Sequence, residues 1–146
     1  MIKNENFKRI INNARVARLA TIDTKCRPYL VPVVFVCDND NHYYIPIDGK
    51  IKQSEDPESL RRVRNIKANP NVALLVDEYT EDWTKLYFIM IQGIASVISK
   101  SIQGSQIRIN RVHKLLSKKY CQYHEVAIGE SVIMLCPQKV FTWKNQ

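Results

Sequence analysis

The sequence predicts a mainly β fold, a largely antiparallel sheet with flanking helices. Strand-like and helix-like segments follow one another in the order helix, three strands, helix, two strands, helix, strand. Two of the strand-like segments are apolar on both alternating sides, as expected where both faces of a strand are covered. The length of 146 residues and a hydrophobic content of 45% suit one domain, residues 1–146, with its own core.

Three strands are expected in the first third of the chain. A short amphipathic helix over 6–14 precedes them, because apolar residues recur there at helical spacing. The first two strands, 15–23 and 27–37, are joined by a turn at Thr24-Lys25, and the third strand covers 42–47.

The second helix has clear start and stop signals. Asp56 suits its N-cap, Pro57 suits its first turn, and Asn69-Pro70 ends it, because the residue before a proline is pushed out of helical geometry. Its buried stripe is expected to consist of Leu60, Val63 and Ile66.

The second half of the chain predicts strands over 72–76, 87–99 and 131–143, with a bulge or bend at Gly93. A helix is expected over about 105–120. Its inward side chains are predicted to be Ile109, Val112, Leu116 and Tyr120, and its basic face Arg108, Arg111, Lys114 and Lys118.

The strand predicted over 27–37 carries apolar side chains on both faces. One face can fill a barrel interior, and the other needs a partner subunit, a ligand or a helix. Pro32 cannot donate a ladder hydrogen bond, which indicates a sheet edge or a break in pairing. An exposed edge beside such a surface suits a flat cofactor; a helix packed over it explains the pattern equally well.

The formal net charge of +8 favours an anionic partner, which leaves nucleic acid, a membrane surface and a phosphorylated cofactor as alternatives. The chain has no apolar run of the about 18 residues that a membrane helix needs, and its first residues are polar. We therefore expect a cytoplasmic protein without a membrane partner. Four scattered cysteines, without a paired Cys or His motif, predict neither a metal site nor structural disulfides.

The order of several motifs resembles the pyridoxamine 5'-phosphate oxidase-like, FMN-binding split-barrel family. The opening hairpin, 14–33, is similar to the family pattern ALATxD, a short turn, then RPxxxPV. Lys50-Ile51-Lys52 and the run 64–77, which contains NPNVALLVD, look like its phosphate-binding loop, helix and following strand. The segments at 79–83, 93–95, 119–123 and 141–143 are similar to the branch associated with the deazaflavin coenzyme F420. Two departures are Cys26, where many relatives have Gly, and an insertion-like segment, Gln53–Glu58.

The resemblance implies a split β-barrel homodimer with two cofactor sites at the subunit interface. It assigns phosphate binding to Lys50 and Lys52 and a polar contact to Asn65. Arg61 and Arg64, one helical turn apart, can face the same anion with planar guanidinium groups. The alternative for this group of residues is a solvated basic loop.

The cofactor ring is implied to lie against the second strand. Tyr29 and Pro32 match ring-facing positions of the family, and Val31 and Val33 offer backbone groups. Trp83 matches a tryptophan near the ring in the F420 branch. Ordinary interface packing for Tyr29, and a core or dimer role for Trp83, are the competing interpretations.

The sequence therefore predicts an oxidoreductase that binds coenzyme F420, or alternatively FMN, and transfers a hydride to or from a small molecule. No motif of a hydrolase, zincin, P-loop or Rossmann protein occurs, and no catalytic residue is assigned. A flavin-type cofactor carries the hydride itself, so the protein needs mainly to bind and orient it. The alternatives are a flavin or haem carrier on the same fold and, less favoured, a nucleic-acid-binding module.

Overall fold

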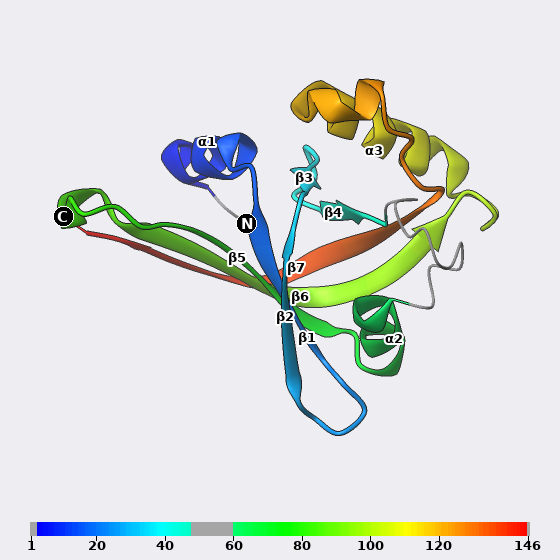
Figure 1. Cartoon of the computed structure of the whole chain (residues 1–146), viewed down its shortest axis with the longest axis horizontal. Helices are drawn as coiled ribbons and strands as arrows, with labels where there is room; N and C mark the ends of the chain where they lie inside the picture. Colours follow the sequence, from blue (N-terminus) through cyan, green and yellow to red (C-terminus); the bar gives the residue numbers. More distant parts are fainter. Residues whose placement is uncertain (1–2, 48–59, 146) are drawn as a thin grey trace.

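The computed structural model describes residues 3–47 and 60–145. It contains three α-helices, seven strands and two short 3-10 helices in these residues (Figure 1). In chain order they are α1 (Glu5–Asn13), β1 (Ala17–Ile22), β2 (Pro28–Val33), β3 (Val36–Cys37), β4 (Tyr43–Pro46), α2 (Arg61–Ala68), β5 (Asn71–Glu78), η2 (Trp83–Lys85), β6 (Tyr87–Ser99), α3 (Gln106–Lys119), η3 (Cys121–His124) and β7 (Ser131–Lys144). The mainly β class is confirmed, and the order differs from the predicted one by a fourth strand between α1 and α2.

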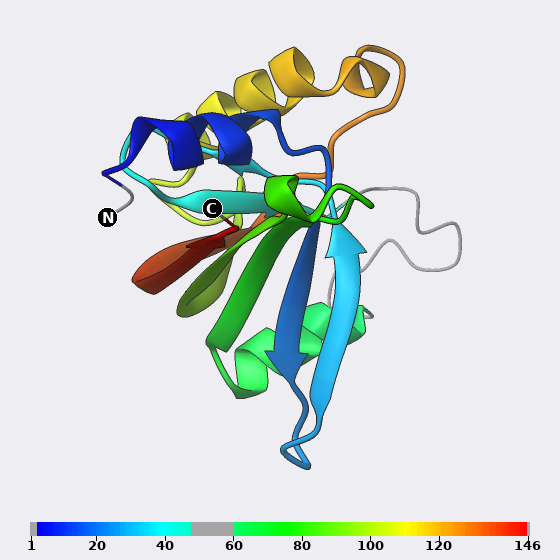
Figure 2. The same ribbon diagram turned by 90° about the vertical axis from the view of Figure 1, so that its left-hand side faces the viewer.

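The seven strands form one sheet in the order β2-β1-β5-β6-β7-β4-β3, and every neighbouring pair is antiparallel. The sheet curls into a half-barrel (Figure 1). Helices α1 and α3 lie on one side of the molecule, whereas the β1–β2 hairpin projects to the other (Figure 2).

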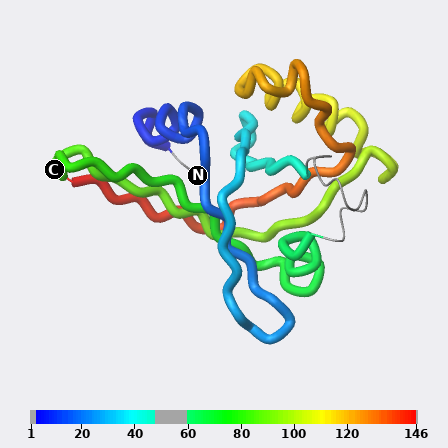
Figure 3. The backbone as a smooth tube through the Cα atoms, in the orientation of Figure 1, coloured from blue at the N-terminus to red at the C-terminus, as the bar shows by residue number. Residues whose placement is uncertain are grey.

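The predicted strand 27–37 is wrong as a single strand. It is divided into β2 and β3, which lie at opposite edges of the sheet. Figure 3 shows the chain continuing from one to the other without a helix between them, and Val34 and Phe35 are the two residues that connect them. The break has a tertiary cause: the Phe35 N–H donates to the Tyr120 hydroxyl, and its carbonyl accepts from the Lys119 ammonium at 3.0 Å. Phe35 therefore satisfies its backbone groups with side chains from α3 and the residue that caps it, rather than with a neighbouring strand.

The main core fills the concave side of the sheet. It gathers inward residues such as Leu19, Leu74 and Ile91, with Ile11 of α1 and Val63 of α2 packed against them. A second cluster lies on the convex side, where Ile109, Val112, Leu116 and Tyr120 pack on β3, β4 and β7. The four inward residues predicted for this helix are confirmed as buried.

Among the described residues, no helix covers the rest of the convex side, which is formed by β2, β1, β5 and the adjoining ends of β6 and β7. Along β2, Tyr29, Val31 and Val33 face inward, whereas Pro28, Leu30 and Pro32 are exposed. Leu30 is 65% exposed, and the rings of Phe88 and Trp143 stack at 6.0 Å on the same side of the sheet. The structure therefore leaves an apolar convex face uncovered, and we call it the open face.

Two positions show why the sheet turns where it does. The hairpin between β1 and β2 places Cys26 at φ 58°, a left-handed conformation that favours Gly. The Asp23 carboxylate stabilises the turn by accepting hydrogen bonds from the N–H groups of Lys25 and Arg27.

The predicted bulge at Gly93 is confirmed by a register shift between Gln92 and Gly93. A Cβ at Gly93 would collide with the backbone carbonyl of Cys136, so the two strands approach closely there.

The helix predicted before Asn69-Pro70 is confirmed as α2, with Asn69 as its C-cap. Its predicted start, Asp56, lies outside the described residues. Among the described residues, no helix has the length and apolar character needed to cross a membrane.

Candidate functional site

Helix α2 meets strand β2 through a contact between Arg61 and Tyr29. The guanidinium carbon of Arg61 lies 5.6 Å from the centre of the Tyr29 ring, within the range of a cation–π interaction. Arg64, one turn further along α2, is exposed on the helix surface. The structure thus brings two of the predicted site residues into contact, while the predicted phosphate ligands Lys50 and Lys52 lie outside the described residues.

Asn65, predicted to touch the cofactor, is turned into the protein. It is 5% exposed, and its Nδ2 donates a hydrogen bond of 3.0 Å to Oγ1 of Thr21 in β1. This buried polar pair fixes α2 against β1 and leaves Arg61 and Arg64 on the solvent side. Asn65 therefore has a positioning contact in this chain, which sequence reasoning did not foresee.

A shallow hollow of about 340 Å³ lies on the open face, over β1 and β5. Thr21 and Pro28 form part of its wall, together with Asn71, Gly93 and Gln138. Ala20 of β1 and Ala73 of β5 form its floor, and their small side chains leave space above the sheet. The volume is at the lower end of the range of about 300–1,000 Å³ for small-molecule sites. Its small side chains and amide groups suit a flat ligand, whereas the Arg61–Tyr29 contact lies on the other side of the sheet.

Three predicted site residues on β2 divide between the faces of the sheet. Val31 and Val33 face the concave side, where Val33 is buried and Val31 packs against the core. Pro32 is exposed on the convex side of this edge strand and pairs in register with Arg18. The prediction that Pro32 marks a sheet edge is confirmed.

Trp83 is not part of this group within one chain. It begins η2, between β5 and β6, at the end of the sheet away from α2 (Figure 1). The Asp82 carboxylate caps this turn by accepting from the Thr84 N–H, and Asn145 Nδ2 donates to the Trp83 carbonyl. The indole itself is 63% exposed, so it has a free aromatic surface for a partner or ligand.

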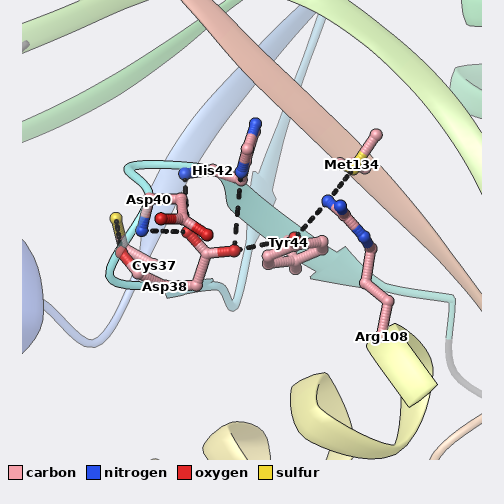
Figure 4. A network of polar contacts seen from close by, with 7 residues as sticks. All are labelled: Cys37, Asp38, Asp40, His42, Tyr44, Arg108 and Met134. Atoms are coloured by element: carbon pink, nitrogen blue, oxygen red, sulfur yellow. Dashed lines mark hydrogen bonds and ion pairs between the residues drawn. The ribbon is translucent and has the colours of Figure 1, made fainter.

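A second polar group, missed by sequence reasoning, surrounds Asp38 (Figure 4). One carboxylate oxygen accepts from the N–H groups of Asp40 and His42, and the other accepts from the Tyr44 hydroxyl at 2.8 Å. Arg108 of α3 completes the chain of contacts, because its Nη1 donates to the Tyr44 hydroxyl at 3.1 Å. Burial, followed by the hydrogen bond to Asp38, raises the pKa of Tyr44 to about 12.

The carboxylates of Asp38 and Asp40 and the His42 imidazole lie within 4.8 Å of one another, a spacing at which they could share a metal ion. Both oxygens of Asp38, however, already accept hydrogen bonds within the turn. Asp38 therefore has a structural role: it closes the turn before β4 and, through Tyr44 and Arg108, ties it to α3. In the sequence, this group could have been recognised from the pattern Asp-x-Asp-x-His in a turn-rich segment.

A cluster around Tyr120 holds the crossing from β2 to β3. Its hydroxyl oxygen lies 3.1 Å from the backbone oxygens of Arg15 and Phe35, and the Arg15 guanidinium carbon lies 4.6 Å from the centre of its ring. The ammonium of Lys119 lies 4.0 Å from the centre of the Phe35 ring. Burial, followed by the neighbouring charge of Arg15, lowers the pKa of Lys119 to about 8.

Comparison with known proteins shows which proteins share this fold. The search of curated proteins found no match. Among solved structures, HutZ, a haem storage protein from Vibrio cholerae, has a TM-score of 0.71 at 18% identity, covering 97% of this chain and 94% of its own. A FAD-binding protein from Mesorhizobium loti has a TM-score of 0.68 at 18% identity, with the same two coverages, 97% and 94%. HupZ from Group A Streptococcus has a TM-score of 0.68 at 16% identity, covering 99% of this chain and 95% of its own.

These identities are too low to transfer a ligand, but the shared fold is the split barrel expected from the sequence. The sequence also matches the pyridoxamine 5'-phosphate oxidase family over residues 4–144, nearly its whole length. The chain belongs to the pyridoxamine 5'-phosphate oxidase family.

Proposed function

We propose that this chain is a homodimeric oxidoreductase that binds a flavin-type cofactor, with coenzyme F420 favoured over FMN, beside Arg61 and Tyr29. The observation that carries the proposal is the Arg61–Tyr29 contact, which places a guanidinium over an aromatic ring at the edge strand β2. Cations beside an aromatic face suit a phosphorylated, planar ligand. The FAD-binding neighbour supports a flavin-type ligand for this fold.

The residues present fit such a cofactor. Arg61 and Arg64 supply cations for its anionic end, and Lys50 and Lys52 extend this charge in the sequence. F420 has a longer acidic tail than FMN, and this arginine-rich helix can neutralise more than one anionic group. When bound, the cofactor accepts or donates the hydride; the protein binds it, orients it and excludes water.

The homodimer is proposed from the open face. Leu30 is 65% exposed on β2, and Phe88 and Trp143 stack on the same convex side without a covering helix. Apolar patches of this kind mark association surfaces. A second copy packed there would cover the outer face of β2 and complete a site that lies at its edge. The exposed Trp83 is then available to the partner's site rather than to its own.

Fluorescence titration tests cofactor binding. We expect F420 to bind with a micromolar or lower dissociation constant, and Arg61→Gln or Arg64→Gln to weaken it about tenfold, the effect of losing one charge-assisted hydrogen bond. Lys25→Gln, at the exposed hairpin tip, is the control and leaves affinity unchanged. Absence of binding of F420 and FMN at about 100 μM contradicts the proposal.

Sedimentation equilibrium tests the dimer. Leu30→Asp places a charge on the open face, so we expect a monomer with weakened cofactor binding. Ile102→Asp changes an exposed side chain elsewhere and preserves both the dimer and the binding. A wild-type monomer at micromolar concentration contradicts the interface.

A carrier function is the second candidate, favoured by the likeness to the haem storage protein HutZ. Haem titration followed by absorbance, together with single-turnover oxidation of the reduced flavin or F420 by a panel of small acceptors, separates the two. Tight haem binding without flavin turnover assigns the carrier function; turnover of bound F420 or FMN assigns the oxidoreductase.

A further inference from the structure

The solvent-facing side of α3 carries an isoleucine followed by three cationic side chains in one row. Ile107, Arg111, Lys114 and Lys118 follow one another at steps of four, three and four residues, which places them on one face of the helix. All four are exposed, whereas Ile109, Val112 and Leu116 on the opposite face are buried. We call this row the α3 crest.

The charge around the α3 crest is of one sign. The sequence contains no Asp or Glu between Asp82 and Glu125, while α3 alone contributes five Lys and Arg residues. Within residues 3–47 and 60–145, neither Arg111, Lys114 nor Lys118 forms an ion pair with a carboxylate. A row of cations without internal partners attracts an anionic surface.

Ile107 distinguishes the crest from an ordinary solvated helix face. It is 76% exposed, more than any other large apolar side chain of the described residues, and Ile102 in the preceding turn is 47% exposed. An isoleucine at this position does not contribute to the structure of one chain. Its exposure beside cations calls for a partner that offers both negative charge and an apolar layer.

An anionic lipid surface provides both. Its headgroups attract Lys and Arg within a Debye length, and the boundary between headgroups and acyl chains accepts an aliphatic side chain. A nucleic acid fits less well, because its phosphates match the cations but single strands are held by exposed aromatic rings. The crest carries no aromatic residue.

The crest is held in a fixed orientation by the rest of the molecule. Arg108, on the flank of α3, bonds to the Tyr44 hydroxyl and to the Met134 sulfur, and Tyr120 anchors the other end of the helix to Phe35. Helix α3 lies at the margin of the molecule, away from α2 and the β1–β2 hairpin (Figures 1 and 2). The crest is therefore separate from Arg61 and Tyr29, the described residues of the proposed cofactor site.

We propose that the α3 crest adsorbs the protein to anionic membrane surfaces, with Arg111, Lys114 and Lys118 at the headgroups and Ile107 inserted below them. The sequence alone predicted no membrane partner, since it contains no spanning segment; the exposed isoleucine is visible only in the structure. Binding is peripheral, reversible and weak, comparable to that of a single acyl anchor, with an association constant of the order of 10⁴ M⁻¹.

Vesicle flotation tests this proposal on the full chain without any cofactor. We expect binding to vesicles of phosphatidylcholine and phosphatidylglycerol at about 1 mM lipid, no binding to phosphatidylcholine alone, and loss of binding as salt is raised. Arg111→Glu/Lys114→Glu weakens binding more than about 100-fold, because each charge near the surface contributes roughly fivefold. Ile107→Ser weakens it roughly tenfold without changing its salt dependence.

Two controls make the result specific. Lys25→Glu/Lys85→Glu makes the same change in net charge at exposed positions of the hairpin tip and η2, and it retains vesicle binding. Circular dichroism confirms that each variant is folded. Equal loss in the control pair, or no wild-type binding to the anionic vesicles, overturns the proposal. So does an oligonucleotide that binds the wild type and Ile107→Ser equally and displaces the vesicles, since the surface is then a nucleic-acid site.

Discussion

The guanidinium of Arg61 lies over the ring of Tyr29, and this contact joins the first residue of α2 to the edge strand β2. A double-mutant cycle with Arg61→Gln and Tyr29→Leu is expected to give a coupling of about 0.5–1 kcal/mol in the free energy of unfolding. The measurement is urea denaturation of the four proteins. The control is the same cycle with Arg64→Gln and Tyr29→Leu, for which we expect a coupling near zero. If the two cycles give equal couplings, the Arg61–Tyr29 contact has no specific effect.

The buried pair of Asn65 and Thr21 predicts a different pattern. Asn65→Leu leaves the Thr21 hydroxyl buried without its amide donor, at a cost of about 1–3 kcal/mol in the free energy of unfolding. Adding Thr21→Val removes the stranded hydroxyl and restores much of that loss, because two apolar side chains then replace a polar pair. A double variant as unstable as the sum of the two single variants contradicts this account.

The left-handed residue at the hairpin tip predicts a stabilising change. Cys26→Gly relieves the steric cost of φ 58°, roughly 1–2 kcal/mol, and part of this gain is cancelled by the greater freedom of Gly in the unfolded chain. We expect a net gain of about 0.5–1 kcal/mol, measured by thermal or urea unfolding. Cys26→Ala keeps the strained conformation and is the control, since an equal gain there would assign the effect to the thiol.

Alkaline pH is expected to destabilise the protein through Cys37. Burial raises the pKa of its thiol from 9.0 to about 11, so above pH 9 the unfolded chain loses the proton first and the folded state does not. Its contribution to stability is therefore complete below pH 9 and is lost as pH rises towards 11, by roughly 2 kcal/mol. Urea denaturation of wild type and Cys37→Ala at each pH gives the free energy of unfolding of both proteins, and the two dependences on pH are then compared.

That comparison is needed because Lys119 acts in the opposite direction. Its pKa is lowered to about 8, so between pH 8 and 10.5 the unfolded chain binds more protons and stability rises with pH. Cys37 is the last and smallest cause of the Lys119 shift, after burial and Arg15, so most of this effect is common to both proteins and cancels in the difference. Identical slopes for wild type and Cys37→Ala between pH 9 and 11 contradict the role of the buried thiol.

The fold was predictable from local patterns wherever a segment has one regular period. Strand β6 covers Tyr87–Ser99 as predicted, and the buried stripe of α3 follows its 3.6-residue spacing. The division between β2 and β3 was not predictable, because it depends on hydrogen bonds from Phe35 to Lys119 and Tyr120, far away in the sequence. An unbroken apolar run contains no sign of such a contact.

The candidate site was predicted as a set of residues rather than as a geometry. The resemblance named Tyr29, and the adjacent arginine of α2 was inferred from its charge; the structure adds the distance between them. The inward orientation of Asn65 depends on its partner in β1, which no local pattern identifies. The exposed Trp83 shows the limit of a single chain, because an aromatic residue at η2 can serve a site in another subunit.

The place of β7 in the sheet has a consequence for how the protein is made. Strands β3 and β4 join the rest of the sheet only through β7, where Tyr43 pairs with Leu135 on one side and β6 pairs along the other. Until residues 131–144 are available, both β4 and β6 present open edges that can pair with other chains. Such distant pairing makes folding slow, on the scale of about milliseconds to seconds, and leaves these edges open to pairing with other chains during this interval.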